Sequence, residues 1–290
     1  MSSRQKHRIE LYRQRDASES VNAAIDFIRQ NWRILLRTAV YCLLPLSIIQ
    51  AIGLSSLFEN MATTRLHVSY SGLWVSLVFG FFAVVIINAL VWTVISYYNE
   101  RDGEISDMTM ADLRARLWRY FLKTLAATTV MAVISVPLVA LTLAVMLIMP
   151  FLALGLSAVA FPSLLVTPVY LLEDKPLTTS VSRAFSLTFS NIGTVIIMGI
   201  VITVLYFVLN LLVSLPLLLM LFVGDTFFLS TASLSPLLTL LEHLFMVVIC
   251  LLQYALVFLF VLIAGMLYGS LVQETDGISI ANDINHFENL

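Results

Sequence analysis

The chain has 290 residues, of which 60% are hydrophobic and 12% are charged, and its formal net charge is −2. An ordinary soluble domain has about 45–50% apolar and about 25% charged residues. This chain therefore has too little polar surface to cover a globule of its size in water. The composition excludes a soluble enzyme, a disordered chain and a nucleic-acid binder. It predicts an all-α, polytopic membrane protein.

Six stretches are long and apolar enough to cross a bilayer, which takes about 20 mostly apolar residues. In chain order they cover 36–57, 73–98, 121–147, 150–172, 194–223 and 245–272. We expect a tight hairpin near Met149 and Pro150, because a single helix over both neighbouring stretches would far exceed the bilayer thickness. The first twenty residues are polar where a cleavable signal peptide would have its apolar core, so we expect no such peptide.

The basic residues predict the orientation of these spans. Fifteen of the sixteen Lys and Arg residues lie in the segment up to Arg37 or in the connections 99–123 and 173–193, and Arg65 alone lies on the opposite side. Because cytoplasmic loops carry an excess of Lys and Arg, both termini are expected in the cytoplasm.

A short motif recurs before the first and fifth expected spans. Residues 20–31 and 180–191 both follow the pattern S-V-x-x-A-(I/F)-x-(F/L)-x-x-x-N, at an offset of 160 residues. A third segment, 109–118, lies about halfway between these two copies. It begins with a Thr-x-x-Asp capping signal and precedes the third span. The sequence therefore predicts three repeats of an amphipathic helix followed by two spans. The predicted divisions are a polar N-terminus over 1–17, a membrane domain over 18–272 with repeats at about 18–98, 106–172 and 176–272, and an acidic tail over 273–290.

The three segments that open these repeats have the apolar spacing of amphipathic helices. We expect each to lie along the cytoplasmic interface, with its apolar side toward lipid or toward the helix bundle. Tryptophan and arginine are typical anchors at that depth. The candidate interfacial residues are Trp32, Trp118, Arg29, Arg114 and Arg183.

Two of these stretches resemble known proteins. Residues 24–33 have the sequence AIDFIRQNWR, and residues 172–176, LEDKP, lead into the second copy of the motif. They are similar to six-helix membrane families of bacteria that are related to the membrane domain of glycerophosphoryl diester phosphodiesterases. The resemblance extends over nearly the whole membrane region and, together with the absence of N-x-S/T sequons, implies a bacterial inner membrane. It implies no catalytic residues, because no soluble stretch here is long enough for the phosphodiesterase catalytic domain.

No Asp, Glu, Lys or Arg lies securely inside an expected span, where charge usually marks a functional site. Four uncharged amides do lie there, namely Gln50, Asn88, Asn210 and Gln253. They either join neighbouring helices by hydrogen bonds or converge on a polar cavity for a neutral or amphiphilic ligand. Asn88 and Gln253 are the first candidates for a ligand site, because each sits well inside its span.

Other motifs give little sign of chemistry. Gly265 and Gly269 form a G-x-x-x-G that permits close helix packing, either within the bundle or with a second copy in a homo-oligomer. The two cysteines and four histidines are not at metal-ligand spacing, and no hydrolase, zinc-protease or nucleotide-binding motif is present. We therefore expect no catalysis, no cofactor and no metal.

Two functional hypotheses remain. The first is a non-catalytic scaffold or accessory subunit, whose amphipathic helices and acidic tail contact a membrane or cytoplasmic protein. The second is a transporter or lipid-handling protein with a midplane cavity lined by the amides. The absence of charge inside the spans favours the scaffold. Replacing Asn88 and Gln253 with leucine distinguishes them, since a scaffold tolerates the change and a ligand pathway loses activity.

Overall fold

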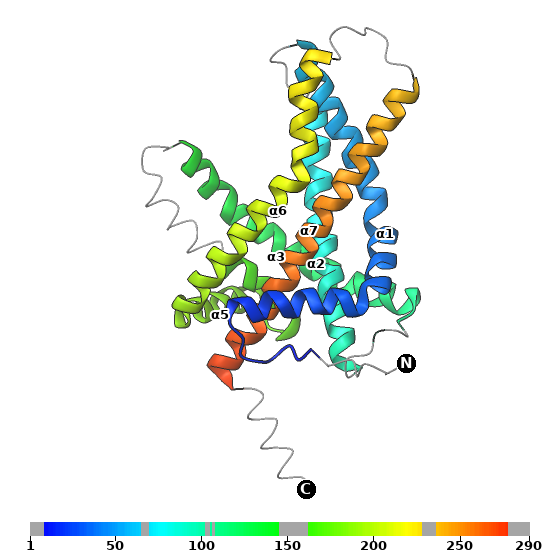
Figure 1. Cartoon of the computed structure of the whole chain (residues 1–290). Helices are drawn as coiled ribbons and strands as arrows, with labels where there is room; N and C mark the ends of the chain where they lie inside the picture. The colour runs from blue at the N-terminus through cyan, green and yellow to red at the C-terminus, as the bar shows by residue number, and fades with distance from the viewer. Residues whose placement is uncertain are drawn as a thin grey trace. The chain divides into compact units, whose positions relative to one another are not determined.

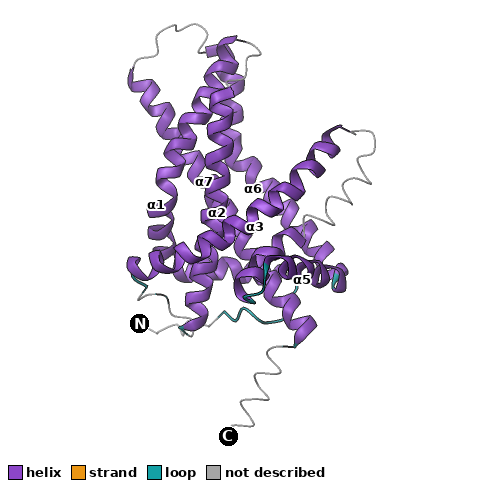
Figure 2. Ribbon diagram, turned by 180° about the vertical axis from the view of Figure 1, so that it is seen from behind, coloured by secondary structure: helices purple, strands orange, loops and turns teal. Residues whose placement is uncertain are grey.

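A computed structural model of the chain describes residues 9–64, 70–101, 105, 108–144, 162–227 and 236–277. Every regular element within these ranges is an α-helix, which confirms the predicted all-α class (Figures 1 and 2). The helices are α1 (Ala17–Thr64), α2 (Tyr70–Glu100), α3 (Met110–Ala144), a shorter helix at Pro162–Leu172, α5 (Leu177–Ser190), α6 (Ile192–Phe227) and α7 (Pro236–Asp276).

Five of the described helices are long and apolar enough to cross a membrane, namely α1, α2, α3, α6 and α7. Their number supports a multi-pass membrane protein. The fourth expected span, 150–172, is described only over Pro162–Leu172, and its residues 150–161 lie outside the described ranges. That short helix alone would not cover about 30 Å of hydrocarbon, so the fourth expected span, and with it a total of six, stays a prediction.

Polar side chains fix the first residues of α1 and α3. The Asp16 carboxylate accepts a hydrogen bond of 2.7 Å from the Glu19 backbone N–H, as an N-cap does. Before α3, the Thr109 hydroxyl accepts from the Asp112 N–H at 3.2 Å, and the Asp112 carboxylate accepts from the Thr109 N–H at 3.3 Å. This reciprocal pair confirms the capping signal predicted from the Thr-x-x-Asp sequence.

The amphipathic segments join the following helices in two ways. Asn191 separates α5 from α6 with non-helical backbone angles, φ −120° and ψ 39°. In α1 and α3 the amphipathic segment continues into the apolar stretch without a break. Gly193 follows Asn191 by two residues, and glycine lowers helix propensity at that point, whereas Asn31 in α1 has no glycine nearby.

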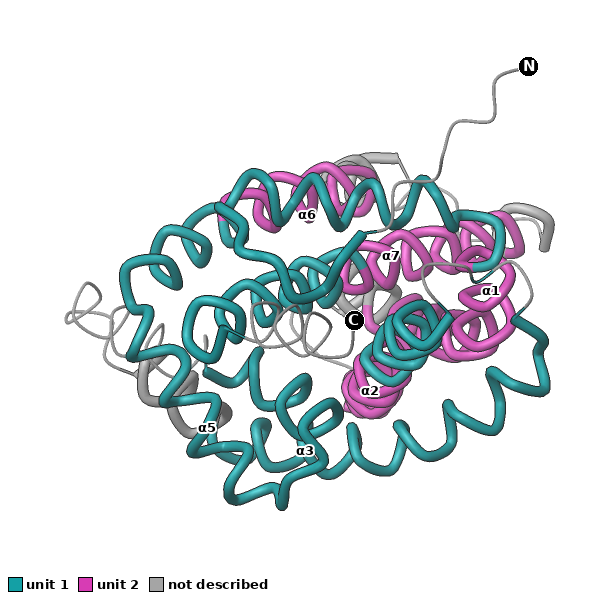
Figure 3. The backbone as a smooth tube through the Cα atoms, turned by 90° about the horizontal axis from the view of Figure 1, so that it is seen from below, with its two compact units in different colours: residues 1–34, 88–203, 259–290 teal, residues 35–87, 204–258 magenta. Residues whose placement is uncertain are grey.

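The chain divides into two compact units, coloured separately in Figure 3. Unit 1 comprises residues 1–34, 88–203 and 259–290, and unit 2 comprises 35–87 and 204–258. Four helices, α1, α2, α6 and α7, contribute a segment to each unit. Unit 1 contains every Lys and Arg of the sequence except Arg37 and Arg65.

The core of unit 1 draws apolar side chains from α3, Pro162–Leu172, α5, α6 and α7. Ala184 and Leu187 lie on the buried face of α5 with Ser180 and Thr188, whereas the apolar Phe189 is 52% exposed. Tyr268 of α7 belongs to the same cluster and is almost completely buried. Unit 1 is therefore a packed assembly in which the amphipathic segments are structural parts.

Unit 2 packs in part through small residues. A Cβ on Gly53 of α1 would lie 2.9 Å from the Ser76 hydroxyl oxygen and 3.2 Å from the Gly72 carbonyl oxygen of α2. A Cβ on Gly72 would lie only 2.8 Å from the Gly53 carbonyl oxygen. The two backbones therefore approach closely, as small residues allow in membrane helices.

Candidate functional site

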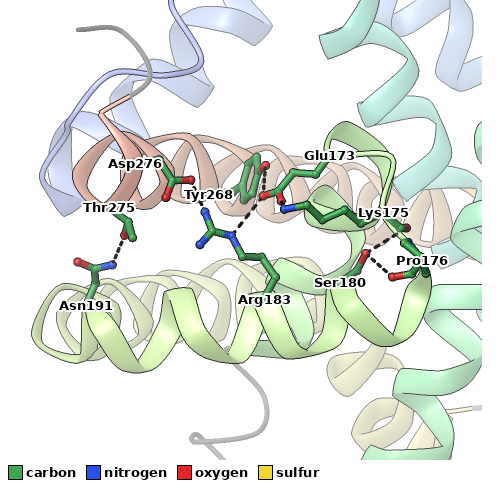
Figure 4. Close-up of polar contacts among 9 residues, drawn as sticks. All are labelled: Glu173, Lys175, Pro176, Ser180, Arg183, Asn191, Tyr268, Thr275 and Asp276. Atoms are coloured by element: carbon green, nitrogen blue, oxygen red, sulfur yellow. Dashed lines mark hydrogen bonds and ion pairs between the residues drawn. The ribbon is translucent and has the colours of Figure 1, made fainter. Parts of the chain in front are cut away.

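Glu173 collects polar side chains from several elements of unit 1, as Figure 4 shows. Its carboxylate accepts a hydrogen bond of 3.2 Å from the Tyr268 hydroxyl of α7 and forms an ion pair with Lys175. The Arg183 Nε of α5 lies 3.7 Å from the same carboxylate, and the other end of that guanidinium pairs with Asp276 of α7. Two carboxylates and two cations thus balance each other, and together they connect α5 with the end of α7.

The turn between Leu172 and Pro176 places Glu173 in this network. Asp174 adopts a left-handed backbone with φ 49°, a conformation that aspartate tolerates better than most residues. Lys123 of α3 donates a hydrogen bond to the Asp174 carboxylate and holds its pKa below the usual range. Pro176 then precedes the first residue of α5. The LEDKP stretch is therefore a fixed turn held by α3.

A strap formed by residues 9–16 lies against the end of α7. The Arg15 N–H donates to the Ser270 hydroxyl at 3.0 Å, and that hydroxyl donates to the Arg15 carbonyl at 3.1 Å. Leu11 is buried, and its carbonyl lies directly against the Cα of Gly269. The Ile9 N–H donates to the Tyr98 hydroxyl of α2 at 2.9 Å. Backbone groups of the strap thus bind two helices of unit 1.

Side chains of the strap extend the network around Glu173. The Tyr12 ring meets the Tyr268 ring edge-on with centroids 6.4 Å apart, and burial raises the pKa of the Tyr12 phenol. The Arg15 guanidinium donates to backbone carbonyls of the strap itself, including that of Leu11 at 3.3 Å. Arg15 therefore stabilises the folded path of the strap and is not free to bind an anion.

A hollow of about 460 Å³ opens in unit 1 beside the strap. It is lined by Gln14, Arg15, Asp16, Ala17, Glu19, Thr194, Ile197, Met198 and Glu274. The lining includes three acidic residues and one arginine, and the guanidinium of that arginine is bonded to the strap. The hollow is consequently acidic, with an apolar wall from α6.

Three of the four amides expected inside the spans lie in unit 2, where they hydrogen-bond within that unit. The Asn210 amide donates to Gln253 at 3.1 Å, Gln253 donates to Ser214 at 3.0 Å, and Ser214 donates to Asn210 at 3.3 Å. Gln50 accepts a hydrogen bond from Tyr254. These contacts join α6 to α7 and α1 to α7. Asn88 lies apart from this set, partly buried on the segment of α2 that belongs to unit 1.

These bonds revise the expectation that a scaffold tolerates this change, and we expect Gln253→Leu to lower the stability of the α6–α7 contact in detergent. An interhelical hydrogen bond in a membrane is worth about 0.6–2 kcal/mol, and Asn210 and Ser214 would each lose one. Thermal unfolding of the purified chain measures the change. Leu252→Ala serves as the control, because Leu252 is the exposed neighbour on the same helix. Equal stability of Gln253→Leu and the wild-type chain would contradict the role of these bonds.

The two glycines of the G-x-x-x-G have different neighbours within unit 1. A Cβ on Gly265 would lie 3.1 Å from the Trp92 ring and 3.4 Å from Ile95, both on α2. A Cβ on Gly269 would collide with the Leu11 carbonyl of the strap. The close contact through Gly53 and Gly72 is not among the sequence-based predictions, although Gly72 and Ser76 form a small-xxx-small pair that indicates it.

The candidate interfacial residues fall into two groups. Trp32 is 52% exposed and Trp118 is 64% exposed, and the nearby Arg29 and Arg114 are also exposed. Arg183 differs, since its side chain is only 22% exposed and belongs to the Glu173 network. Among the described residues no group of His, Cys, Asp and Glu has the arrangement of a metal site.

Comparison with known proteins gives no relative, since no family model, curated protein or solved structure matches the chain. The relationship to the membrane domain of glycerophosphoryl diester phosphodiesterases therefore stays a prediction.

Proposed function

We propose that the chain is a non-catalytic membrane scaffold or accessory subunit that docks a basic segment of a partner protein in the acidic hollow of unit 1. The observation that carries this proposal is the hollow itself, which is open and whose three carboxylates come from the strap, α1 and α7. The amides of unit 2 favour it further, because Asn210, Gln253 and Gln50 have partners on neighbouring helices. A midplane pathway would leave such groups available for a ligand.

We further propose six spans, with unit 1 on the cytoplasmic side. The strap before α1 bonds to the end of α2 and to the end of α7, so these chain positions lie on one side. The start of α3 also contacts the end of α2, through the ion pair of Arg116 with Glu100. Asn191, before α6, bonds to Thr275 at the end of α7. The chain must then return between α3 and α6, which favours a sixth crossing, and the clustering of basic residues in unit 1 favours its cytoplasmic placement.

The internal repeat belongs to the same proposal. The side-chain amides of Asn31 and Asn191 donate to the carbonyl four residues earlier, at 3.0 and 3.1 Å respectively. Three further pairs of matching positions are buried in both segments, namely Ser20 and Ser180, Ala24 and Ala184, and Phe27 and Leu187. The first and third repeats thus place the same motif positions against the protein, as segments of common origin would.

Native mass spectrometry tests the docking face. The tagged chain is released from its own membrane in mild detergent, as wild type and as Glu19→Lys, Glu274→Lys and Asp26→Lys. Asp26 is exposed on α1 outside the hollow, so its variant is a control with the same charge change. We expect a stoichiometric protein partner with wild type and with Asp26→Lys, and its loss by at least tenfold with the two hollow variants.

Other outcomes contradict the proposal in distinct ways. A partner that all four chains retain equally would place docking elsewhere. A lone chain that keeps one specific lipid or small molecule would favour the transporter or lipid-handling hypothesis.

A further inference from the structure

Two helices of unit 1, α1 and α3, present the same exposed combination of arginine and tryptophan. On α1, Arg29 precedes Trp32 by three residues, and on α3, Arg114 precedes Trp118 by four. Residues three or four apart on a helix are neighbours on its surface. All four of these side chains are exposed, so each helix has a basic and aromatic group side by side outside the core.

These arginines differ from the cations of unit 1 that form ion pairs. Arg116 pairs with Glu100, Lys123 with Asp174, and Arg183 with two carboxylates. The side chains of Arg29 and Arg114 form no hydrogen bond or ion pair with any residue that the structure describes. Among the described residues, therefore, no carboxylate pairs with either arginine, although carboxylates are present in the same unit.

The apolar neighbours of each arginine indicate how deep in a bilayer its helix would lie. On α3, Trp118 stacks on Phe121 with ring centroids 5.7 Å apart, and Leu122 on the same face is 52% exposed. On α1, Ile25 is exposed one turn before Arg29. Exposed indole and aliphatic groups beside an unpaired guanidinium suit the boundary between headgroups and acyl chains. A basic soluble surface would have no reason to expose them.

We propose that the Arg29–Trp32 and Arg114–Trp118 faces bind the phosphate groups of anionic phospholipids. The guanidinium can donate two parallel hydrogen bonds to a phosphate, and the tryptophan beside it packs on the glycerol and upper acyl region. The occupant is a lipid headgroup because the apolar residues adjoin both arginines. The inference does not depend on the partner protein, since none of these residues lines the acidic hollow.

Tryptophan fluorescence in reconstituted membranes provides the test. The purified chain carries Trp74→Phe and is placed in vesicles of phosphatidylcholine with increasing amounts of brominated phosphatidylglycerol or brominated phosphatidylcholine. Bromine quenches only nearby indoles, so Trp32 and Trp118 report lipid contact, while the fully buried Trp92 gives the unquenched reference. The ratio of quenching by brominated phosphatidylglycerol to quenching by brominated phosphatidylcholine gives the preference for phosphatidylglycerol.

We expect Arg29→Gln and Arg114→Gln each to lower that preference about fivefold, the equivalent of about 1 kcal/mol per arginine at an anionic surface. Arg116→Gln is the matched control on α3 and should change it less than twofold, because Arg116 is already paired. Arg114→Lys keeps the charge and should retain most of the preference, which separates binding from a folding defect.

Two results would overturn the proposal. One is equal quenching by both brominated lipids in the parent chain. The other is displacement of the phosphatidylglycerol preference by millimolar inorganic phosphate, which would assign the arginines to a soluble anion.

Discussion

Replacement of Gly269 by alanine is expected to release the strap from α7 and to lower the free energy of unfolding by about 1–3 kcal/mol. The new Cβ would overlap the Leu11 carbonyl, which is backbone and has no rotamer to escape into. Moving Leu11 would also disturb the neighbouring bonds between Arg15 and Ser270. The substitution thus removes a buried apolar contact and two hydrogen bonds together.

Limited proteolysis with trypsin measures this release, because the strap contains Arg13 and Arg15. Arg15 is buried in the folded chain, and we expect cleavage after it to become at least tenfold faster in Gly269→Ala. Gly193→Ala is the control, since a Cβ there would have no neighbour within 4 Å. Alanine should even stabilise α6 at that position by about 0.5–1 kcal/mol. Unchanged cleavage of Gly269→Ala would show that the strap does not depend on this close contact.

Features that depend on the local sequence could be predicted well. The apolar stretches that became α1, α2, α6 and α7 were apparent because membrane insertion depends on hydropathy summed over about 20 residues. The capping pair at Thr109 and Asp112 was apparent because both partners lie within four residues. Neither prediction required knowledge of which helices are neighbours.

Features that join distant parts of the chain could not be predicted from one sequence. The polar N-terminus gave no sign that Arg15 would bond to Ser270, 255 residues later. A G-x-x-x-G indicates that something approaches closely, but it does not say that a non-helical strap is what approaches Gly269. Arg183 likewise resembled an interfacial anchor, because its two carboxylate partners lie on other elements.

The described helices extend beyond the expected spans for a related reason. Hydropathy marks the stretch that lipid can accept, whereas a helix continues as long as its backbone bonds are undisturbed. α1 therefore begins at Ala17, well before the apolar stretch that starts at residue 36. Helix propensity favours a continuous helix over residues 17–35, since this segment contains neither glycine nor proline.

Breaking the ion pair between Arg183 and Glu173 is expected to lower the free energy of unfolding by about 1–3 kcal/mol. Removing one partner of a fully buried pair costs about 3–5 kcal/mol, and the smaller figure applies because Glu173 is 16% and Arg183 22% exposed. Arg183→Gln would leave Glu173 with Lys175 and Tyr268, and would leave Asp276 without its ion-pair partner. Glu173→Gln would instead leave Arg183 with Asp276 alone.

A double-mutant cycle isolates the interaction from these side effects. The free energies of unfolding of Arg183→Gln, Glu173→Gln and the double variant are compared with wild type by thermal or denaturant unfolding in detergent. We expect a coupling energy of at least about 0.5 kcal/mol, so that the double variant is less destabilised than the two single changes added together. A coupling indistinguishable from zero would contradict a direct pair.

The contact of Lys123 with Asp174 supplies the matched control for this cycle. Asp174 lies in the same turn as Glu173, yet its side chain is 80% exposed, so solvent screens its attraction to Lys123. Asp174→Asn keeps a residue that tolerates the left-handed backbone, so it removes the charge without straining the turn. We expect it to cost less than about 1 kcal/mol. If it destabilised the chain as much as Glu173→Gln does, the turn as a whole, and not the pairing of α5 with α7, would account for the stability of this part of unit 1.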